Sequence, residues 1–250
     1  MAPNEEESIY ECDHHIRLLL SRSDAIVSGI AQMGQTNPLE TKLLLQYLRQ
    51  GDTVVEVGTY KDGWLALVSS GVVGLAGHVF CFEPIPDYYS AFKKNIDLND
   101  RRNITVENVA ISDTVGTTTF SLREGNSSMV LEYDVPVERV AVQTTTLDEW
   151  FGSKGVDSVT LAIIDTEGAE TKVLNGAKHM LSKTTYLIIE VIDSFCQQTG
   201  TTAEKLICLV CSFGFTPYVF TRRGLVPWQS GKQSETLNFF FINEALHCRR

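Results

Sequence analysis

The chain has no surplus of basic residues. Its 31 acidic residues outnumber its 21 lysines and arginines, and the formal net charge is −10 at pH 7. A chain of this charge binds a phosphate backbone only through a local basic patch, and its basic residues are scattered apart from the pairs Arg222-Arg223 and Arg249-Arg250. We therefore expect no nucleic-acid partner.

The sequence also lacks a segment that could cross a membrane or direct export. It has no run of about 20 apolar residues, and residues 1–33 contain no apolar signal core. We expect a cytoplasmic protein. The six cysteines form no paired metal motif, because Cys208-x-x-Cys211 has no second pair or histidine cluster at metal spacing. They are predicted to be free thiols, most of them buried.

No linker rich in proline, glycine or serine divides the 250 residues, so one main domain is expected, over residues 51–250. Residues 1–50 are predicted to be a helical extension that packs on this domain or covers its ligand site, because their apolar residues recur at roughly helical spacing. His14 and His15 lie in the extension and are interpreted as surface histidines.

The centre of the predicted domain is a β-α-β unit. Residues 53–57 are a β-branched run, residues 61–73 carry apolar positions at helical spacing, and residues 78–82 form a second apolar run. Glu83 ends that run and Pro84 stops it, which places an acid at the carboxyl end of the second strand. A carboxylate there can accept hydrogen bonds from both hydroxyls of a ribose.

The loop after the first strand indicates which nucleotide this unit would bind. Gly58 and Gly63 fit the first and third glycines of a dinucleotide fingerprint, but Tyr60 stands in the place of the second. In the fingerprint, that second glycine allows the backbone to approach a pyrophosphate. A tyrosine there argues against NAD or FAD and favours a nucleoside ligand without phosphate, such as S-adenosylmethionine (SAM). An ordinary strand–glycine–helix turn, with Glu83 merely solvated, is the alternative.

The alternation of strands and helices continues through the rest of the chain. Residues 86–98 have helical spacing, and residues 104–106 are a third short strand that completes a Rossmann half. The apolar runs at residues 158–164 and 186–189 are typical of central parallel strands.

Three further segments are predicted outside this alternation. Residues 116–122 resemble an extra strand, and the β-rich runs 216–221 and 237–242 predict an antiparallel hairpin at the sheet edge. Residues 123–140 lose all periodicity, with Asn126, Ser127 and Ser128 in a polar, turn-forming run. We interpret this long irregular segment as a loop that covers the substrate.

Several motifs occur in a characteristic order and together resemble the FkbM family of SAM-dependent methyltransferases over roughly residues 50–193. The Asp-x-Glu-Gly-Ala-Glu block is specific, and its order relative to Phe-Glu-Pro is more so. The motifs that carry the resemblance are Val55-Glu-Val-Gly58, Phe82-Glu-Pro84 with Asn95 and Asn99, Asn108-Val-Ala-Ile-Ser-Asp-Thr-Val-Gly116, Thr146-Leu-Asp148, Ile164-Asp-Thr-Glu-Gly-Ala-Glu170 and Val173-Leu-Asn-Gly176.

The resemblance implies an α/β class I methyltransferase fold, a Rossmann-like seven-stranded sheet with helices on both faces and an antiparallel C-terminal strand. It also implies SAM as the cofactor and O-methylation of a hydroxyl or carboxylate on a small molecule. A subunit or scaffold that binds SAM or S-adenosylhomocysteine (SAH) without turnover is the alternative, and Tyr60 disfavours a dehydrogenase. The residues expected to bind the cofactor are Glu56, Gly58, Thr59, Tyr60, Gly63, Glu83, Pro84, Asn108, Val109 and Asp165.

Three acidic residues are candidates for catalysis. Methyl transfer depends mainly on alignment, and a carboxylate at the end of a central strand can accept the proton of an acceptor hydroxyl. Asp165, Glu167 and Glu190 are these candidates, although Glu167, like Glu170, could instead be a first-turn acid favoured by the helix dipole. Paired carboxylates could hold Mg²⁺, as in catechol-type methyltransferases, but nothing in the sequence fixes a third ligand, and no metal is predicted.

The chain departs from the family pattern at two places. The family's loop usually begins with aspartate and continues Gly-Ala-Asn-x-Gly, whereas this chain has Glu56, Thr59 and Tyr60, with Gly63 one place late. A lysine usually stands two places before the family's aspartate, where this chain has Ile163. The acceptor cannot be read from the sequence, because the segments that would recognise it are the least patterned.

Overall fold

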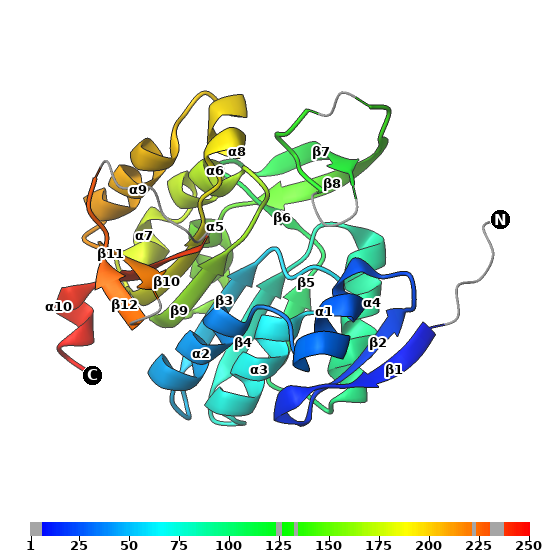
Figure 1. The fold of residues 1–250 in the computed structure, drawn as a ribbon. Coiled ribbons are helices and arrows are strands. Elements are labelled where there is room, and N and C mark those ends of the chain that lie inside the picture. The colour runs from blue at the N-terminus through cyan, green and yellow to red at the C-terminus, as the bar shows by residue number, and fades with distance from the viewer. Residues whose placement is uncertain (1–6, 124–126, 133–134, 222–223, 231–237) are drawn as a thin grey trace.

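The computed structural model describes residues 7–123, 127–132, 135–221, 224–230 and 238–250. Its main element is a mixed sheet of eight strands (Figure 1). From one edge to the other the strands are β12 (Gly224–Pro227), β11 (Thr216–Thr221), β13 (Asn238–Ile242), β10 (Thr184–Glu190), β9 (Val159–Ile164), β3 (Thr53–Val57), β4 (His78–Phe82) and β5 (Ile104–Glu107). The predicted α/β class is confirmed, with one strand more than the predicted seven because β12 pairs with the outer edge of β11.

The last strand of the sheet lies in its interior. Strands β5, β4, β3, β9 and β10 are parallel, and β13 pairs antiparallel with both β10 and β11. The two β-rich C-terminal runs therefore pair as predicted, but they do not form an edge hairpin. Residues 239–242 are all buried, and strands that are apolar on both faces need cover on both sides.

Helices cover both faces of the sheet (Figure 1). On one face lie α1 (Ala25–Met33), α2 (Pro38–Tyr47), α3 (Trp64–Val73) and α4 (Pro86–Leu98). On the other lie α5 (Leu147–Lys154), α6 (Glu170–Asn175), α7 (Lys178–Leu181), α8 (Asp193–Gln198) and α9 (Ala203–Ser212). None of the helices in the described ranges is both long and apolar enough to cross a membrane.

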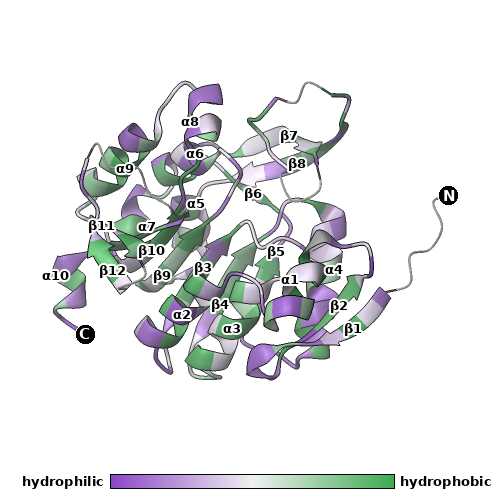
Figure 2. Cartoon of the chain, in the orientation of Figure 1, coloured by the Kyte–Doolittle hydropathy of each residue, from purple (hydrophilic) through white to green (hydrophobic). Residues whose placement is uncertain are grey.

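The hydropathy of the chain follows these layers (Figure 2). Strand β9 is hydrophobic along almost its whole length, whereas β10 begins with Thr184 and Thr185 and is most hydrophobic at residues 187–189. Both strands are buried on both faces, which is typical of central parallel strands. An acid follows each apolar run, Asp165 after β9 and Glu190 as the last residue of β10. The sequence therefore places an acidic residue at the carboxyl end of each of these two strands.

The N-terminal segment is not helical throughout, so that prediction was wrong for residues 7–21. These residues form a hairpin of β1 (Glu7–Glu11) and β2 (Arg17–Ser21), joined by the short 3-10 helix η1 (Asp13–His15). The burial of Ile16, Leu18 and Leu20 alternates with period two, as in a strand on a core. Because Leu18, Leu19 and Leu20 are consecutive, Ile16, Leu19 and Leu20 also satisfy a helical spacing, which explains the error.

Asn95 of α4 and Asn99, the residue that follows this helix, hold the hairpin in place. The side-chain oxygen of Asn95 accepts from the backbone N–H of Leu19 at 2.7 Å, and that of Asn99 accepts from the N–H of Arg17 at 2.8 Å. Both asparagines belong to the motif that follows Phe-Glu-Pro in the sequence. Their role in this structure is to bind the extension to the domain.

A second, three-stranded sheet lies beside the main one. It contains β6 (Ala110–Ile111), β8 (Glu138–Thr145) and β7 (Gly116–Leu122), in that spatial order. The predicted strand at residues 116–122 is confirmed. The predicted irregular segment 123–140 is shorter than expected, because β8 begins at Glu138 and pairs along the whole of β7. Asn126 lies outside the described residues.

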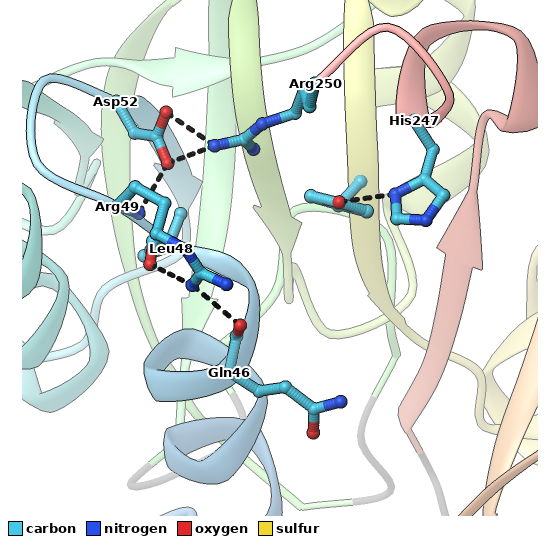
Figure 3. Close-up of polar contacts among 7 residues, drawn as sticks. Gln46, Leu48, Arg49, Asp52, His247 and Arg250 are labelled. Atoms are coloured by element: carbon cyan, nitrogen blue, oxygen red, sulfur yellow. Dashed lines mark hydrogen bonds and ion pairs between the residues drawn. The ribbon is translucent and has the colours of Figure 1, made fainter.

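The C-terminal residues pack against the amino-terminal end of β3 (Figure 3). After helix α10 (Glu244–His247), the guanidinium of Arg250 donates to both carboxylate oxygens of Asp52, at 2.7 and 2.6 Å. His247 Nδ1 lies 2.6 Å from the hydroxyl of Tyr186 on β10. These contacts join the end of the chain to the sheet, at the end opposite to the acidic residues.

Several predictions about single side chains can be compared with the structure. His14 and His15 are exposed, as predicted. The six cysteines are free, but only Cys81 and Cys196 are buried, so the prediction that most of them would be buried was wrong. Cys208 lies on the outer face of α9 and is exposed, because its apolar neighbours on the helix take the inner face.

Candidate active site

A cavity of about 270 Å³ lies at the carboxyl ends of β3, β4 and β9. In the register of these parallel strands, Val57 is opposite both Phe82 and Ile164, so the residues that follow each strand meet at one edge. Open α/β sheets bind their ligands there. The predicted cofactor-binding residues that line the cavity are Glu56, Gly58, Thr59, Tyr60, Glu83, Pro84 and Asp165.

Glu83 joins the loop after β3 to the loop after β4. Its Oε2 accepts from the backbone N–H of Tyr60 at 3.0 Å, and its Oε1 accepts from the N–H of Ile85 at 2.9 Å. The residue is 3% exposed, and burial raises the pKa of its carboxyl to about 7, although the two N–H groups oppose this shift. Each oxygen keeps a lone pair with which it can accept a ligand hydroxyl.

Tyr60 has a left-handed backbone, with a φ of 55°. This conformation costs a residue other than glycine about 1 kcal/mol or more, and asparagine tolerates it better than tyrosine does. It explains why an asparagine suits this position in the family pattern. The ring of Tyr60 is held by an edge-on contact with Tyr88, at 4.8 Å between centroids, and by the ammonium of Lys61 at 5.1 Å.

The two glycines of the loop have different roles. A Cβ on Gly58 would lie 1.7 Å from the carbonyl oxygen of Asp165, so β3 and β9 can approach only because this residue is glycine. A Cβ on Gly63 would lie 1.9 Å from the ring of Phe92. Gly63 does not line the cavity, and its place in the structure is the packing of α3 against α4.

Asn108 and Val109 also lie outside the cavity wall. The amide of Asn108 donates to the carbonyl oxygens of Glu83 and Pro84, each at 2.9 Å, so it supports the turn that carries Glu83. Val109 packs against the main hydrophobic core. Both residues were expected to bind the cofactor, but in the structure they support the cavity from one layer behind its wall.

Buried acids occupy the part of the cavity next to the glycine loop. Glu56 is 4% exposed, and its Oε2 and the hydroxyl of Thr59 have no hydrogen-bond partner among the described residues. Burial raises the pKa of Glu56 well above its usual value, and the nearby carboxylates of Asp62, Asp165 and Glu83 raise it further.

Asp62 is a residue that the sequence reasoning missed. It lines the cavity, and burial raises the pKa of its carboxyl to about 6. The hydroxyl of Thr36 donates to it at 3.5 Å. Its position just before Gly63 in the glycine loop was a usable signal, because an acid in such a loop faces the ligand edge of the sheet.

The three catalytic candidates lie together. One oxygen atom from each of Asp165, Glu167 and Glu190 lies within 4.8 Å of the other two. Burial and the neighbouring carboxylates raise the pKa of Asp165 and of Glu190, and the two side chains share a hydrogen bond. Asp165 and Glu167 line the cavity, whereas Glu190 lies behind them, outside the cavity wall.

Glu170 is a structural acid. Its Oε1 accepts from the backbone N–H groups of Thr166 and Gly168, at 3.0 and 3.2 Å, and from the hydroxyl of Thr166 at 3.0 Å. It thereby closes the turn that follows β9. Glu170 lies in the first turn of α6, which agrees with its interpretation as a first-turn acid. Glu167 has a left-handed φ of 52°, precedes α6 and lines the cavity.

The segment 127–131 packs on the same turn. Ser128 is 1% exposed, and its hydroxyl donates to the carbonyl oxygen of Glu167 at 2.6 Å while it accepts from the N–H groups of Val130 and Leu131. Ser127 and Met129 line the cavity on either side of it. Ser128 therefore fixes the position of the segment relative to the candidate catalytic residues.

The N-terminal segment supplies another part of the wall, through Ile26, Thr36 and Asn37. It is held to the glycine loop by an ion pair between Lys61 Nζ and the buried Asp24, at 2.7 Å. No sequence signal identified these residues individually, because no motif covers them. The remaining wall is largely apolar and includes Ile85, Tyr88, Ala110, Ile111 and Phe120.

The charge of the cavity has one sign. Five carboxyl groups line it, and within the part of the chain that the structure describes no lysine, arginine or histidine does. The carboxyl groups belong to Glu56, Asp62, Glu83, Asp165 and Glu167. Such a site favours a ligand that carries positive charge.

Comparisons with known proteins agree with the methyltransferase motifs. The family model described as the methyltransferase FkbM domain matches residues 56–217. The curated 2-O-methyltransferase NoeI of Sinorhizobium fredii is 28% identical over 155 residues, which is 54% of this chain and 62% of that protein.

Two solved structures are similar to the chain at low identity. Methyltransferase FkbM from Methylobacillus flagellatus is 16% identical, with a TM-score of 0.48 over 79% of this chain and 45% of that one. An O-methyltransferase from Bacillus cereus in complex with SAH is 12% identical, with a TM-score of 0.47 over 83% and 81% of the two chains. The chain spans less than two thirds of NoeI and less than half of the FkbM structure.

Proposed function

The chain belongs to the FkbM methyltransferase domain family, and from this membership we propose that it transfers a methyl group from SAM to a hydroxyl of a small molecule. The observation that carries the proposal is the acidic cavity at the carboxyl edge of the sheet, crossed by Glu83. SAM would supply an electrophilic methyl group on a sulfonium. The protein's part is to bind and align the two reactants.

The residues of the cavity fit SAM in polarity and charge. Glu83 has a free lone pair on each oxygen for the ribose hydroxyls, and the buried, unpartnered Oε2 of Glu56 suits the α-ammonium group. Ile85, Ala110 and Phe120 offer an apolar surface for the adenine. Tyr60 supports the choice against a dinucleotide, because its ring lines the cavity at the position where a pyrophosphate binder needs glycine.

Asp165 is the proposed acceptor of the hydroxyl proton. It lies on the cavity wall and shares a hydrogen bond with Glu190, and this bond requires one proton between the two carboxyl groups. With that proton on Glu190, Asp165 is ionised and can accept the proton of the hydroxyl. Glu167 is the second carboxyl group at this end of the cavity and is proposed to orient the acceptor.

A neutral hydroxyl is favoured over a carboxylate as the acceptor. A carboxylate would enter a cavity that already holds five carboxyl groups and, among the described lining residues, no basic side chain. The name of NoeI, a 2-O-methyltransferase, accords with a hydroxyl acceptor. A small molecule is likewise favoured over nucleic acid, since the chain has a net charge of −10.

Calorimetry and a transfer assay test the proposal together. The protein is titrated with SAM, SAH, NAD and NADP, and it is then incubated with methyl-labelled SAM and matched acceptors that carry either hydroxyl or carboxylate groups. We expect binding of SAM and SAH alone, and label in the hydroxyl set. Binding of SAM without methyl transfer to any of these acceptors would favour the alternative of a SAM-binding scaffold. Binding of NAD in place of SAM would refute the proposal.

A further inference from the structure

The wall of the cavity offers no positively charged group to an anionic part of a ligand. Among the described residues that line it there is no lysine, arginine or histidine. The methionine end of SAM is a zwitterion, in which an α-carboxylate and an α-ammonium group are bonded to the same carbon atom. A site that binds SAM here must therefore receive the carboxylate with neutral hydrogen-bond donors.

Most of the hydroxyl and N–H groups on the wall are already used within the protein. Those that donate to protein acceptors belong to Thr36, Trp64, Ser127 and Thr166. Tyr60 and Tyr88 pack on each other and beside the ammonium of Lys61. Apart from these two tyrosines, the side-chain donors that remain among the described lining residues are the amide of Asn37 and the hydroxyl of Thr59.

The amide of Asn37 is not used by the helix that it precedes. The residue stands at the N-cap of α2 with a left-handed backbone, φ 47° and ψ 54°. An N-cap residue is usually extended, and its side-chain oxygen accepts from a backbone N–H of the first turn, but Asn37 makes no such bond. Left-handed residues other than glycine are concentrated at ligand sites, and Tyr60 and Glu167 on the same cavity also have a positive φ.

Asn37 lies at the end of the cavity that holds Glu56. The hydroxyl of its neighbour Thr36 donates to Asp62 at 3.5 Å, which connects this segment to the loop after β3. Burial, and after it the carboxylate of Asp62, raises the pKa of Glu56, so these two acids are close to each other. An α-ammonium group bound by Glu56 would place the α-carboxylate at this same end.

Thr59 offers a second donor from the loop after β3. Its side chain is 4% exposed and lines the cavity, and its hydroxyl has no hydrogen-bond partner among the described residues. A buried hydroxyl without a partner is costly unless a ligand completes it. Thr59 and Asn37 thus come from two different segments that meet at the same end of the cavity.

We propose that the amide of Asn37 binds the α-carboxylate of SAM, with the hydroxyl of Thr59 as a second donor. This role rests on the proposed function, because it requires that the cavity bind SAM. Asn37 precedes residues 56–217, which match the family model, so membership of the family does not assign it. The N-terminal extension would then be a part of the cofactor site and not only its cover.

Calorimetry with SAM and with decarboxylated SAM tests this role, because the second ligand lacks the carboxylate and keeps the ribose, the sulfonium and the ammonium group. The wild type should bind SAM more tightly. Asn37→Gly removes the amide and tolerates a positive φ. It should weaken the binding of SAM about 10-fold and leave that of decarboxylated SAM nearly unchanged. The factor is at the low end for a bond to a charged group because Asn37 is exposed.

Asn37→Asp gives a second, opposite test. It keeps the shape of the side chain and replaces its donors with a charge that repels a carboxylate, so this variant should bind decarboxylated SAM more tightly than SAM. The matched control is Asn175→Asp, the same change at an exposed position of α6 outside the cavity wall. It should keep the preference of the wild type for SAM.

Thermal denaturation without ligand checks that each variant is folded, and Asn37→Asp takes the place of Asn37→Gly if the glycine variant is not. Equal affinities of the wild type for the two ligands, or an equal loss of both in a folded Asn37 variant, would refute the role of Asn37. Absence of any binding of SAM or SAH to the wild type would refute the proposed function itself. Loss of methyl transfer with an intact preference for SAM would refute the transfer alone.

Discussion

Glu83→Gln removes a charge and keeps the size of the side chain that connects the loops after β3 and β4. In the wild type each carboxylate oxygen accepts one backbone N–H, from Tyr60 and from Ile85. A glutamine keeps one acceptor and turns an NH₂ group toward the other N–H, so one of the two bonds is lost. The variant therefore weakens both the loop and the proposed contact with the ribose hydroxyls.

The expected magnitude depends on pH. A hydrogen bond to a charged group is worth about 1.5–3 kcal/mol, or roughly 10- to 150-fold in SAM affinity, when Glu83 is ionised. Its pKa is raised to about 7, so ionised Glu83 rises from about a tenth of the protein at pH 6 to about nine tenths at pH 8. The affinity of the wild type for SAM should therefore increase about 5- to 10-fold over this range.

The stability of the protein without ligand should change in the opposite direction. The folded-state pKa of Glu83 is raised from the usual 4.5 to about 7, so the folded protein holds an extra proton between these values. The extra proton stabilises the folded protein, and this stabilisation is fully present below about pH 4.5. As the pH rises through 7 it is lost, and the free energy of unfolding falls by about 3 kcal/mol. Glu83→Gln should lack this pH dependence.

Calorimetry with SAM at pH 6, 7 and 8, on the wild type and the variant, measures the effect, and urea unfolding at the same pH values confirms that the variant is folded. The two proteins should differ most at pH 8 and least at pH 6. Parallel pH profiles, with a constant ratio of affinities, would show that ionised Glu83 does not bind the ligand. Equal affinities at pH 8 would remove Glu83 from the site.

The other predictions concern three different parts of the molecule. In the wild type the indole N–H of Trp64 donates to the hydroxyl of Thr41 at 2.8 Å, and Thr41→Val leaves this N–H buried without an acceptor. Urea unfolding should show that the free energy of unfolding falls by about 1–3 kcal/mol. An unchanged free energy of unfolding would mean that water replaces the hydroxyl. Ser128→Ala removes the bond to Glu167 and should raise the KM for the acceptor with little change in SAM affinity by calorimetry; a matching loss of SAM affinity would assign the segment to the cofactor. Asp165→Asn should lower kcat/KM about 10²- to 10⁴-fold in the transfer assay, and near-normal kinetics would exclude it as the base.

The parts of the fold that were predicted from the sequence are those fixed by local patterns. The β-α-β unit, the acid at the end of β4 and the buried strands β9 and β10 each follow from the spacing of apolar residues over a few turns or one strand. The strand ends also led to Glu83, Glu56 and Asp165, because parallel strands bring their carboxyl ends to one edge of the sheet.

The features that were missed depend on contacts between distant segments. The β1–β2 hairpin is held by Asn95 and Asn99, which lie 76 and 82 residues away along the chain from their partners on β2. The place of β13 inside the sheet depends on which strands flank it, and no local pattern records that. Ile26 and Thr36 reach the cavity only because the extension folds back over the glycine loop, so their place in the wall could not be predicted from spacing.

The interior position of β13 has a consequence for the order in which the chain can fold during synthesis. Until residues 238–242 have left the ribosome, β10 and β11 have no strand between them, and the hydrogen-bonding edge of β10 is open to other chains. The nascent protein thus keeps its central sheet incomplete until residues 238–242 have been made. A chain that stops before residue 238 should therefore aggregate, even though the proposed SAM-binding residues are all present in it.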